Sequence, residues 1–511
     1  MMTKAVSKRM WLAIGAAALH ACSADTTARE VVTACDTMAA AIFDPNTVTD
    51  PVPWEDLDAS AALAACAADL KTYPDATRLK LLKARALLKL KKNTEAVALL
   101  EELDAQSYAA ASYLLGNQRV QGKILKKDIS QGYALLRRAA EGGIGYAAET
   151  ISTLYFNGTA ETPQSDEDAL IWAQRAVEAG AGHFALGFLY DNGRGVEASA
   201  PKAIEYYEIA AERGDQRGLE ALGAVYYNGR GIPAEPAKGV QYFSDAFETY
   251  KSPFAAYWLG LAHETGKGQT KSAQKAAEYY LAAVEQNNAD AMTRLAVLIF
   301  NTKALPFTDE DAVSWLKKAS TLKNASGMYN LGWAYANGRG VKKSASKSRR
   351  WFRKAAEAGS AAGQEVVGIN YYKGNGVRQD YKEARVWLEK AADANRPKAA
   401  YWFAYMHETG KGGKIDMQKA SDYYVIAAKT KFKDSLERAR KTTDLAIKEL
   451  DEKTALLDKG WTKCGFRICS LLGSKFVYLT SDKVYWYYAD GRVVPKDRVP
   501  DIGKQLRERN Q

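Results

Sequence analysis

The stretch GMYNLGWAYANGRGVKKSASKSRRWFRKAAEAG, which covers positions 327–359, decides how this chain folds. Leu331 and Tyr335 lie four positions apart, so they share one face of a helix. The run NGRG at 337–340 ends that helix, because glycine adopts the left-handed conformation that a helix C-terminus requires. A second apolar face follows in the run WFRKAA at 351–356. The stretch therefore predicts two helices joined by a glycine-rich turn.

The same pattern recurs with a period close to 36 residues. A small residue in each first helix recurs at Gly116, Ser152, Gly187, Gly223, Gly260, Ala296, Gly332, Gly368 and Ala404. A bulky aromatic residue, expected in the core, recurs in the second helix at Tyr279, Trp315, Trp351, Trp387 and Tyr423. The two series indicate nine tandem units over 109–434, as in a solenoid whose units bury their apolar faces only against their neighbours. Hydrophobic residues make up 47% of the chain, which excludes wholesale disorder.

The turns and the second helices carry a family resemblance. The turns at 228–232 (NGRGI) and 374–377 (GNGV), and the second-helix run at 351–359 (WFRKAAEAG), resemble the Sel-one-like repeat (SLR) family of the tetratricopeptide (TPR) superfamily. The resemblance implies an all-α, TPR-like right-handed α-solenoid that binds other proteins. The turns at 156–159 and 300–303 depart from the pattern, so we expect irregular packing there.

The segments outside the repeats differ in character. Two leucine-rich amphipathic helices at 60–108 predict a TPR-like capping hairpin. A disulfide-stapled segment at 22–59 precedes it, and a charged helix at 435–459 follows the repeats. The runs KFVYLT and KVYWYY, rich in aromatic and β-branched residues, predict a small β-meander within 460–511, which ends in a basic tail.

The N-terminal residues have the features of an export signal. Three basic residues precede an apolar run at 11–19 that is too short to span a bilayer. The run ends in LHAC, which resembles the bacterial lipobox, although His20 stands where a small residue is usual. We therefore predict a signal peptide over 1–21 and lipidation of Cys22, with cleavage alone as the alternative.

The five cysteines fit an exported protein. If Cys22 carries lipid, two local pairs remain, Cys35 with Cys66 and Cys464 with Cys469. Each pair is readily bridged in an oxidising compartment. A metal site is the alternative, but no histidine lies near either pair and neither pair has C-x-x-C spacing. We therefore predict two disulfides and no metal site.

The chain has only four histidines and lacks the common catalytic motifs, including H-E-x-x-H and G-x-S-x-G. The pairs His263-Glu264 and His407-Glu408 lie four periods apart, too far to converge, and each histidine stands where other repeats have tyrosine. We therefore expect no enzyme activity and no cofactor. The alternative is a relative of the penicillin-binding SLR proteins with enzyme-like activity. Those proteins have a disulfide in most repeats, whereas no cysteine lies between Cys66 and Cys464 here.

Charge is unevenly distributed along the repeats. Residues 141–220 include 14 acidic and 5 basic side chains, whereas 317–400 include 18 basic and 6 acidic ones. We call seven of these basic residues the basic patch: Lys342, Lys343, Lys347, Arg349, Arg350, Arg353 and Lys354. The asymmetry predicts attraction of an anionic polysaccharide, a lipid headgroup or an acidic protein, and the alternative is an ordinary solvated helix face. Export disfavours nucleic acid as a partner.

The third residue of each repeat alternates between aromatic and polar. The aromatic positions, which we call the groove rings, are Tyr113, Phe184, Tyr257, Tyr329 and Tyr401. First helices of TPR solenoids line a concave groove, so these rings are candidates to anchor a peptide or to stack on sugars. The alternative is that they fill contacts between helices.

These features together predict a non-catalytic scaffold in the periplasm, anchored to the outer membrane through lipidated Cys22. The resemblance implies assembly of an envelope or exopolysaccharide-secretion complex, or regulation of an envelope signalling partner. If the signal is not used, the alternative is a cytoplasmic adaptor.

Overall fold

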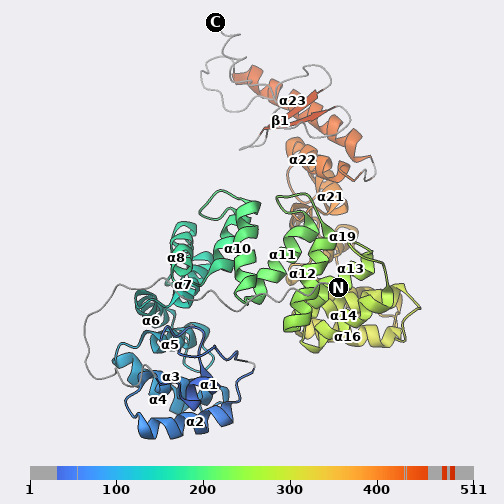
Figure 1. Cartoon of the computed structure of the whole chain (residues 1–511). Coiled ribbons are helices and arrows are strands. Elements are labelled where there is room, and N and C mark those ends of the chain that lie inside the picture. The colour runs from blue at the N-terminus through green and yellow to red at the C-terminus, as the bar shows by residue number, and fades with distance from the viewer. Residues whose placement is uncertain are drawn as a thin grey trace. The chain divides into compact units, whose positions relative to one another are not determined.

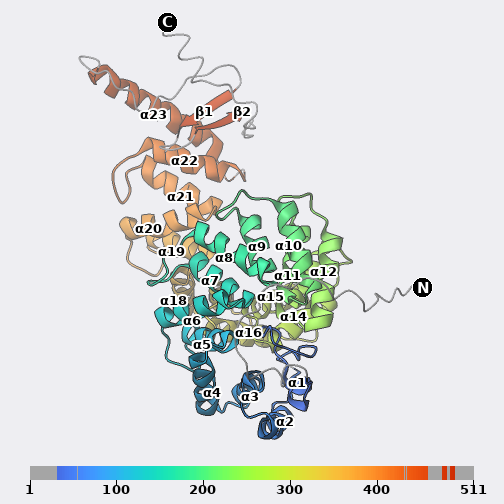
Figure 2. The same cartoon turned by 60° about the vertical axis from the view of Figure 1, so that its left-hand side comes forward.

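The computed structural model describes residues 31–54, 56–430, 432, 434–457, 475–479 and 484–488. The predicted signal peptide, Cys22, Cys464 and Cys469 lie outside these residues. The chain divides into two compact units, 1–242 and 243–511, with the boundary inside α12 (Pro236–Tyr250). Figures 1 and 2 show that the described residues form helices almost throughout. None of these helices is both long and apolar enough to cross a membrane.

Nine helix pairs follow one another through the repeat region. The first unit contains α5 (Ala109–Gln121), α6 (Ile129–Glu141), α7 (Gly145–Asn157), α8 (Asp166–Glu178), α9 (His183–Asn192), α10 (Ala200–Glu212) and α11 (Gln216–Asn228). The second contains α13 (Pro253–Thr265), α14 (Ala273–Glu285), α15 (Ala289–Asn301), α16 (Asp309–Thr321), α17 (Ala325–Asn337), α18 (Ala345–Glu357), α19 (Ala361–Lys373), α20 (Tyr381–Asp393), α21 (Pro397–Glu408) and α22 (Met417–Ala428). Odd-numbered helices are the first helices of their repeats. The predicted all-α, TPR-like solenoid is confirmed.

A close approach at the small residue of the first helix joins each pair. A Cβ atom added at Gly260 would lie 2.6 Å from the ring of Tyr280, and one at Gly332 would lie 2.8 Å from the ring of Phe352. The glycines therefore let the second helix seat a large side chain directly against the first helix. The turn after the first helix is also as predicted, since Gly338 ends α17 in the left-handed conformation, with φ 72°.

The residue that enters this contact is one position later than the sequence suggested. Tyr280 and Tyr424 are fully buried, whereas the predicted core residues Tyr279 and Tyr423 are half-buried. Trp315 and Trp351 are likewise half-buried, whereas Trp387 is buried as predicted. One residue turns a helix by about 100°, so neighbouring aromatic residues cannot both face the first helix.

The two irregular turns behave as expected. Whereas most first helices end at a left-handed glycine, α15 ends at Thr302 in extended conformation, with φ −138°. Gly158, which ends α7, has ψ 141° and lies outside the left-handed helical region. These repeats keep the helix pair but lack the standard cap, because their sequences lack the full glycine turn.

The N-terminal cap has three helices where the sequence suggested two. They are α2 (Ala59–Thr72), α3 (Thr77–Lys89) and α4 (Asn93–Ala105), and α1 (Ala34–Ala39) precedes them. Pro74 follows the end of α2, as expected of a residue that cannot continue a helix. The predicted Cys35–Cys66 disulfide is present and joins α1 to α2.

The C-terminal region begins with α23 (Ser435–Leu457), which packs on α22 (Figure 2). The strands β1 (Lys475–Leu479) and β2 (Val484–Tyr488) pair antiparallel, with Lys475 opposite Tyr488. They coincide with the two predicted strand segments. The rest of the predicted β-meander lies outside the described residues, so the meander as a whole is not supported.

We expect Tyr280→Ala to lower the free energy of unfolding by about 3–5 kcal/mol, as for other large buried side chains. The substitution leaves a cavity against Gly260 and removes the bond that the Tyr280 hydroxyl donates to Glu264 Oε2, at 2.6 Å. Tyr279→Ala, one position earlier on the half-buried side, is the matched control and should cost about 1 kcal/mol. Urea unfolding followed by circular dichroism measures both losses. Equal losses would contradict the assignment of Tyr280 to the core.

Candidate partner-binding surfaces

First helices of successive repeats contact one another within each unit. These contacts join α5 to α7 and α7 to α9 in the first unit, and α13 to α15, α15 to α17 and α19 to α21 in the second. These first helices therefore form shared surfaces, over α5, α7 and α9 in the first unit and over α13, α15 and α17 and then α19 and α21 in the second, and the groove rings were predicted to line such surfaces.

The groove rings are partly engaged in packing. Four of them contact the ring 23 positions later, on the second helix of the same repeat: Phe184 with Tyr207, Tyr257 with Tyr280, Tyr329 with Phe352, and Tyr401 with Tyr424, at centroid distances of 5.3–6.1 Å. Tyr401 is only 5% exposed, and its hydroxyl donates to Asp434. Tyr113 packs on Phe43, and burial raises its pKa to about 12. Packing thus accounts for much of the pattern, and partner binding by all five rings stays a prediction.

Phe184 is the groove ring that lines a cavity on the first-helix surface. The cavity has a volume of about 240 Å³ and is bounded by α7, α9 and α11. Phe156 and Phe188 form its apolar lining with Phe184, and the Phe156 and Phe188 ring centroids are 5.2 Å apart. The sequence analysis missed Phe156 and Phe188, because they lie outside the third position of the repeat. The sequence feature that could have identified these two residues is the high aromatic content of α7 and α9.

An ion pair closes one edge of this cavity. The Arg217 guanidinium bonds Glu149 at 2.7 Å and lies 4.6 Å from the centre of the Phe184 ring. Glu149 is 7% exposed, so its charge is largely removed from water and needs this partner. Thr153 and Asn157, which also line the cavity, are exposed. The cavity therefore combines an apolar floor with polar groups at its edge.

The glutamates of the two His-Glu pairs have a structural role. Glu264 and Glu408 accept hydrogen bonds from Tyr280 and Tyr424, both at 2.6 Å. The same arrangement occurs at Asp191, which accepts from the Tyr207 hydroxyl. An arginine completes each site: Arg230 beside Asp191, Arg294 beside Glu264 and Arg438 beside Glu408. Burial raises the pKa of all three tyrosines, which keeps them neutral donors.

The two histidines are packed separately from each other. The ring of His263 stacks on Tyr279, and its Nδ1 lies 3.0 Å from the Thr270 carbonyl oxygen. His407 is 7% exposed and contacts the Phe403 ring, with centroids 4.7 Å apart. Burial, helped by the positive charge of Arg385, lowers the pKa of His407 to about 4. Among the described residues, no cluster of three or more potential metal ligands occurs.

Most of the basic patch lacks acidic partners. Arg353 bonds Glu357 at 2.9 Å and donates to the Tyr371 hydroxyl at 2.7 Å. Lys354 and Lys347 lie over the rings of Trp351 and Tyr335. Within the described part of the chain, no ion pair involves the other four residues, Lys342, Lys343, Arg349 and Arg350. Their charges therefore project an unneutralised positive field from α18 and the turn before it.

These features define a helical-repeat protein in which neighbouring first helices lie against one another. A family model for the Sel1 repeat matches eight segments that together exceed half of the chain: 109–144, 147–180, 181–215, 217–248, 253–288, 325–360, 361–395 and 397–429. The chain belongs to the Sel1 repeat family and is a protein-interaction scaffold. The helix pair at α15 and α16 is the one of the nine that the family model omits, consistent with its irregular turn.

Comparison with individual proteins finds similarity to other Sel1 repeat proteins. The chain is 24% identical to a Sel1 repeat protein from Oxalobacter formigenes, with TM-score 0.42, over 48% of this chain and 96% of that one. It is 22% identical to c5321, a protective antigen of uropathogenic Escherichia coli with an SLR fold, with TM-score 0.32, over 73% and 99%. It is also 30% identical over 129 residues to the chitin synthase regulator SKT5 of Malassezia restricta. That match covers 24% of this chain and 9% of the regulator.

The low pKa of His407 predicts a loss of stability in mild acid. The folded protein holds His407 neutral down to about pH 4, whereas the unfolded chain protonates it below its usual pKa of 6.5. The free energy of unfolding should therefore fall by about 2–3 kcal/mol from this residue as the pH drops through that window. His407→Tyr, which installs the residue that other repeats have there, should remove this part of the pH dependence. Urea unfolding at several pH values measures the effect, and identical slopes for both proteins would refute it.

Proposed function

We propose that this protein is a non-catalytic scaffold that holds a partner protein along the first helices of its repeats. The observation that carries the proposal is the cavity lined by the first helices α7, α9 and α11. Membership of the Sel1 repeat family supports the general role. Penicillin binding is not favoured, since the repeats contain no cysteine with which to form a disulfide.

The cavity has the composition of an anchor site for an apolar side chain. Its floor consists of phenylalanine rings, which offer a large buried contact area to a leucine or aromatic residue of a partner. The adjacent Glu149–Arg217 pair offers hydrogen-bonding groups to the partner's backbone. Anchors of this kind dominate the affinity of protein interfaces, because a central side chain is fully removed from water.

A second part of the proposal concerns the basic patch, which we assign to an anionic polysaccharide. Lys342 and Arg350 are exposed and lie in a segment with a strong excess of basic residues. A positive surface of this kind raises the rate at which a polyanion is encountered. Similarity to a fungal chitin synthase regulator, a protein connected with polysaccharide synthesis, is consistent with this assignment.

We further propose that the protein acts in the cell envelope, on the periplasmic side of the outer membrane and held there by lipidated Cys22. Assembly of an envelope or exopolysaccharide-secretion complex, or control of an envelope signalling partner, is the corresponding role. The Cys35–Cys66 disulfide supports an oxidising compartment. Labelling with radioactive palmitate should mark the wild type and leave Cys22→Ser unmarked. Equal labelling of both proteins, or no labelling of either, would exclude lipidation at this residue. Retention of the full-length chain in the cytoplasm would favour the alternative role of a cytoplasmic adaptor.

A bulky residue at the edge of the cavity should block the partner protein. Thr153 is exposed, and its hydroxyl bonds only the carbonyl of Glu149 in its own helix, so Thr153→Arg should leave the fold intact. We expect partner capture by cross-linking in the native cell to fall by about tenfold, or about 1.4 kcal/mol. Gln174→Arg, at an exposed position on α8, is the matched control. Equal capture by both variants would place the interface elsewhere.

Binding of a polyanion should depend on salt and on the basic patch. We expect polygalacturonate to bind less tightly as ionic strength rises, because charges farther apart than about 8 Å are screened at physiological salt. The double variant Lys342→Glu/Arg350→Glu should weaken binding and flatten the salt dependence. Lys123→Glu/Lys126→Glu makes the same charge change at exposed positions of the first unit and should have less effect. If both double variants behave alike, net charge and not the basic patch governs binding.

A further inference from the structure

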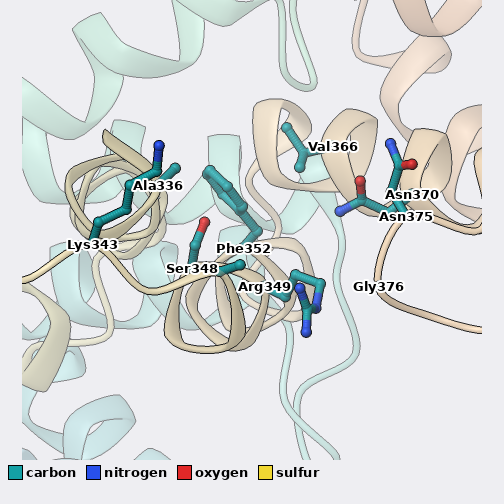
Figure 3. Close-up of a pocket in the computed structure, with 10 residues that line it drawn as sticks. Ala336, Lys343, Ser348, Arg349, Phe352, Val366, Asn370, Asn375 and Gly376 are labelled. Carbon is teal, nitrogen blue, oxygen red and sulfur yellow. The ribbon is translucent and has the colours of Figure 1, made fainter. Parts of the chain in front are cut away.

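The basic patch adjoins a polar pocket of about 420 Å³ between α18, α19 and the turns that follow α17 and α19. Figure 3 shows Phe352 and Ser348 at its centre, with Lys343 on one side and Arg349, Asn370 and Asn375 on the other. The volume falls within the usual range of small-molecule sites. No acidic side chain lines the pocket, so its electrostatic character is positive.

The polar side chains of this pocket take no part in the hydrogen-bond network of the described residues. Its five polar lining side chains are Lys343, Ser348, Arg349, Asn370 and Asn375. Within the described residues, none of these side chains forms a hydrogen bond or an ion pair. Elsewhere in the repeats, comparable side chains bond a carbonyl or a carboxylate, as Arg339 does with Asp309. These groups are therefore available to a ligand.

Asn370 replaces an apolar residue of both neighbouring repeats, and Arg349 replaces an apolar residue of the repeat before it. One period before Arg349 stands Val313, which is 2% exposed. Ala334 and Met406, one period before and after Asn370, are both fully buried. Arg349 and Asn370 are half-buried instead, because they line the open pocket. Asn370 is therefore a polar residue at a position that is apolar and buried in both neighbouring repeats, which favours a role in binding.

An ion pair that crosses two other repeat junctions is absent at this pocket. Arg339 pairs with Asp309 across the preceding junction, and Arg194 with Asp166 in the first unit. One period after Asp309 and Arg339, the chain has Ala345 and Asn375, both of which line the pocket. These two residues cannot form the closing ion pair, and the space remains.

Arg349 differs from its counterpart in the next repeat. Arg385, one period later, donates hydrogen bonds to the carbonyl oxygens of Met406, Lys411 and Lys414, at 2.8–3.1 Å. Arg349 makes no such bond among the described residues, and its guanidinium lies against Gly376, where a Cβ atom would come within 2.5 Å. Gly376 therefore leaves room for a guanidinium whose donors remain available at the edge of the pocket.

We infer that this pocket binds an acidic sugar residue of a polysaccharide. Arg349 would hold the carboxylate, since a guanidinium fork matches its two oxygens, and Lys343 on the opposite side adds positive charge to the pocket. The amides of Asn370 and Asn375 and the hydroxyl of Ser348 each offer a donor and an acceptor to sugar hydroxyls. The Phe352 ring gives an apolar surface for the C–H face of the sugar. The inference deepens the polysaccharide part of the proposed function and rests on it.

The test is isothermal titration of the full chain with digalacturonate, compared with the neutral disaccharide galactobiose and with the dipeptide Glu-Glu. We expect digalacturonate to bind at least tenfold more tightly than either. The double variant Ala345→Asp/Asn375→Arg rebuilds the closing ion pair without changing net charge, and it should weaken digalacturonate binding at least tenfold. Arg350→Ala removes an exposed cation of α18 that does not line the pocket, and it should change binding less than twofold.

Arg349→Val, which restores the residue type of Val313, is the second variant if the closed double variant does not fold. Equal binding of Glu-Glu or galactobiose, or unchanged binding by both pocket variants, would overturn the inference. If polygalacturonate binds in a salt-dependent way that Lys342→Glu/Arg350→Glu weakens while digalacturonate does not bind, the pocket fails and the basic patch stands. If neither sugar binds, both the pocket and the polysaccharide part of the proposed function fail.

Discussion

The contact between a small residue of one helix and a large side chain of the next is the interaction on which the rest of the structure depends. At Gly260 and Gly332 no Cβ separates the helices, so the rings of Tyr280 and Phe352 lie directly against the backbone. A unit of two helices has too little core of its own and stays folded only when its neighbours cover it. The repeat period, the glycine turns and the buried positions of the second helix follow from this requirement.

Repetition also makes departures from the pattern informative. A residue that differs from its counterparts one period away has the same backbone setting, so the difference reflects a local need. Arg349 and Arg385 illustrate this, because they occupy the same position in successive repeats. Arg385 donates hydrogen bonds to backbone carbonyls, whereas Arg349 makes no such bond among the described residues. The phenylalanine cavity in the first unit is a second departure, in which neighbouring first helices supply rings to one place.

Charge has two separate roles in this chain. Half-buried acids such as Asp191 and Glu408 are matched by a tyrosine hydroxyl and an arginine, so their desolvation is offset and they help to fix the register between repeats. Lys342 and Arg350 of the basic patch have no such partners in the described structure and face solvent. The His-Glu pairs, which suggested acid–base chemistry, belong to the first group, because their glutamates serve the packing of the second helix.

The sequence by itself determined the repeated helix pairs, the glycine turns, the family and the Cys35–Cys66 pairing, because these depend on local periodicity and short separations along the chain. Only the tertiary structure decided which of two adjacent aromatic residues, Tyr279 or Tyr280, enters the core. It also decided that Pro74 separates two cap helices and that Phe156 and Phe188 meet beside Phe184. The pocket at Arg349 was beyond the reach of the sequence for a physical reason. It is lined by side chains of adjacent repeats, and the sequence does not show how these side chains come together.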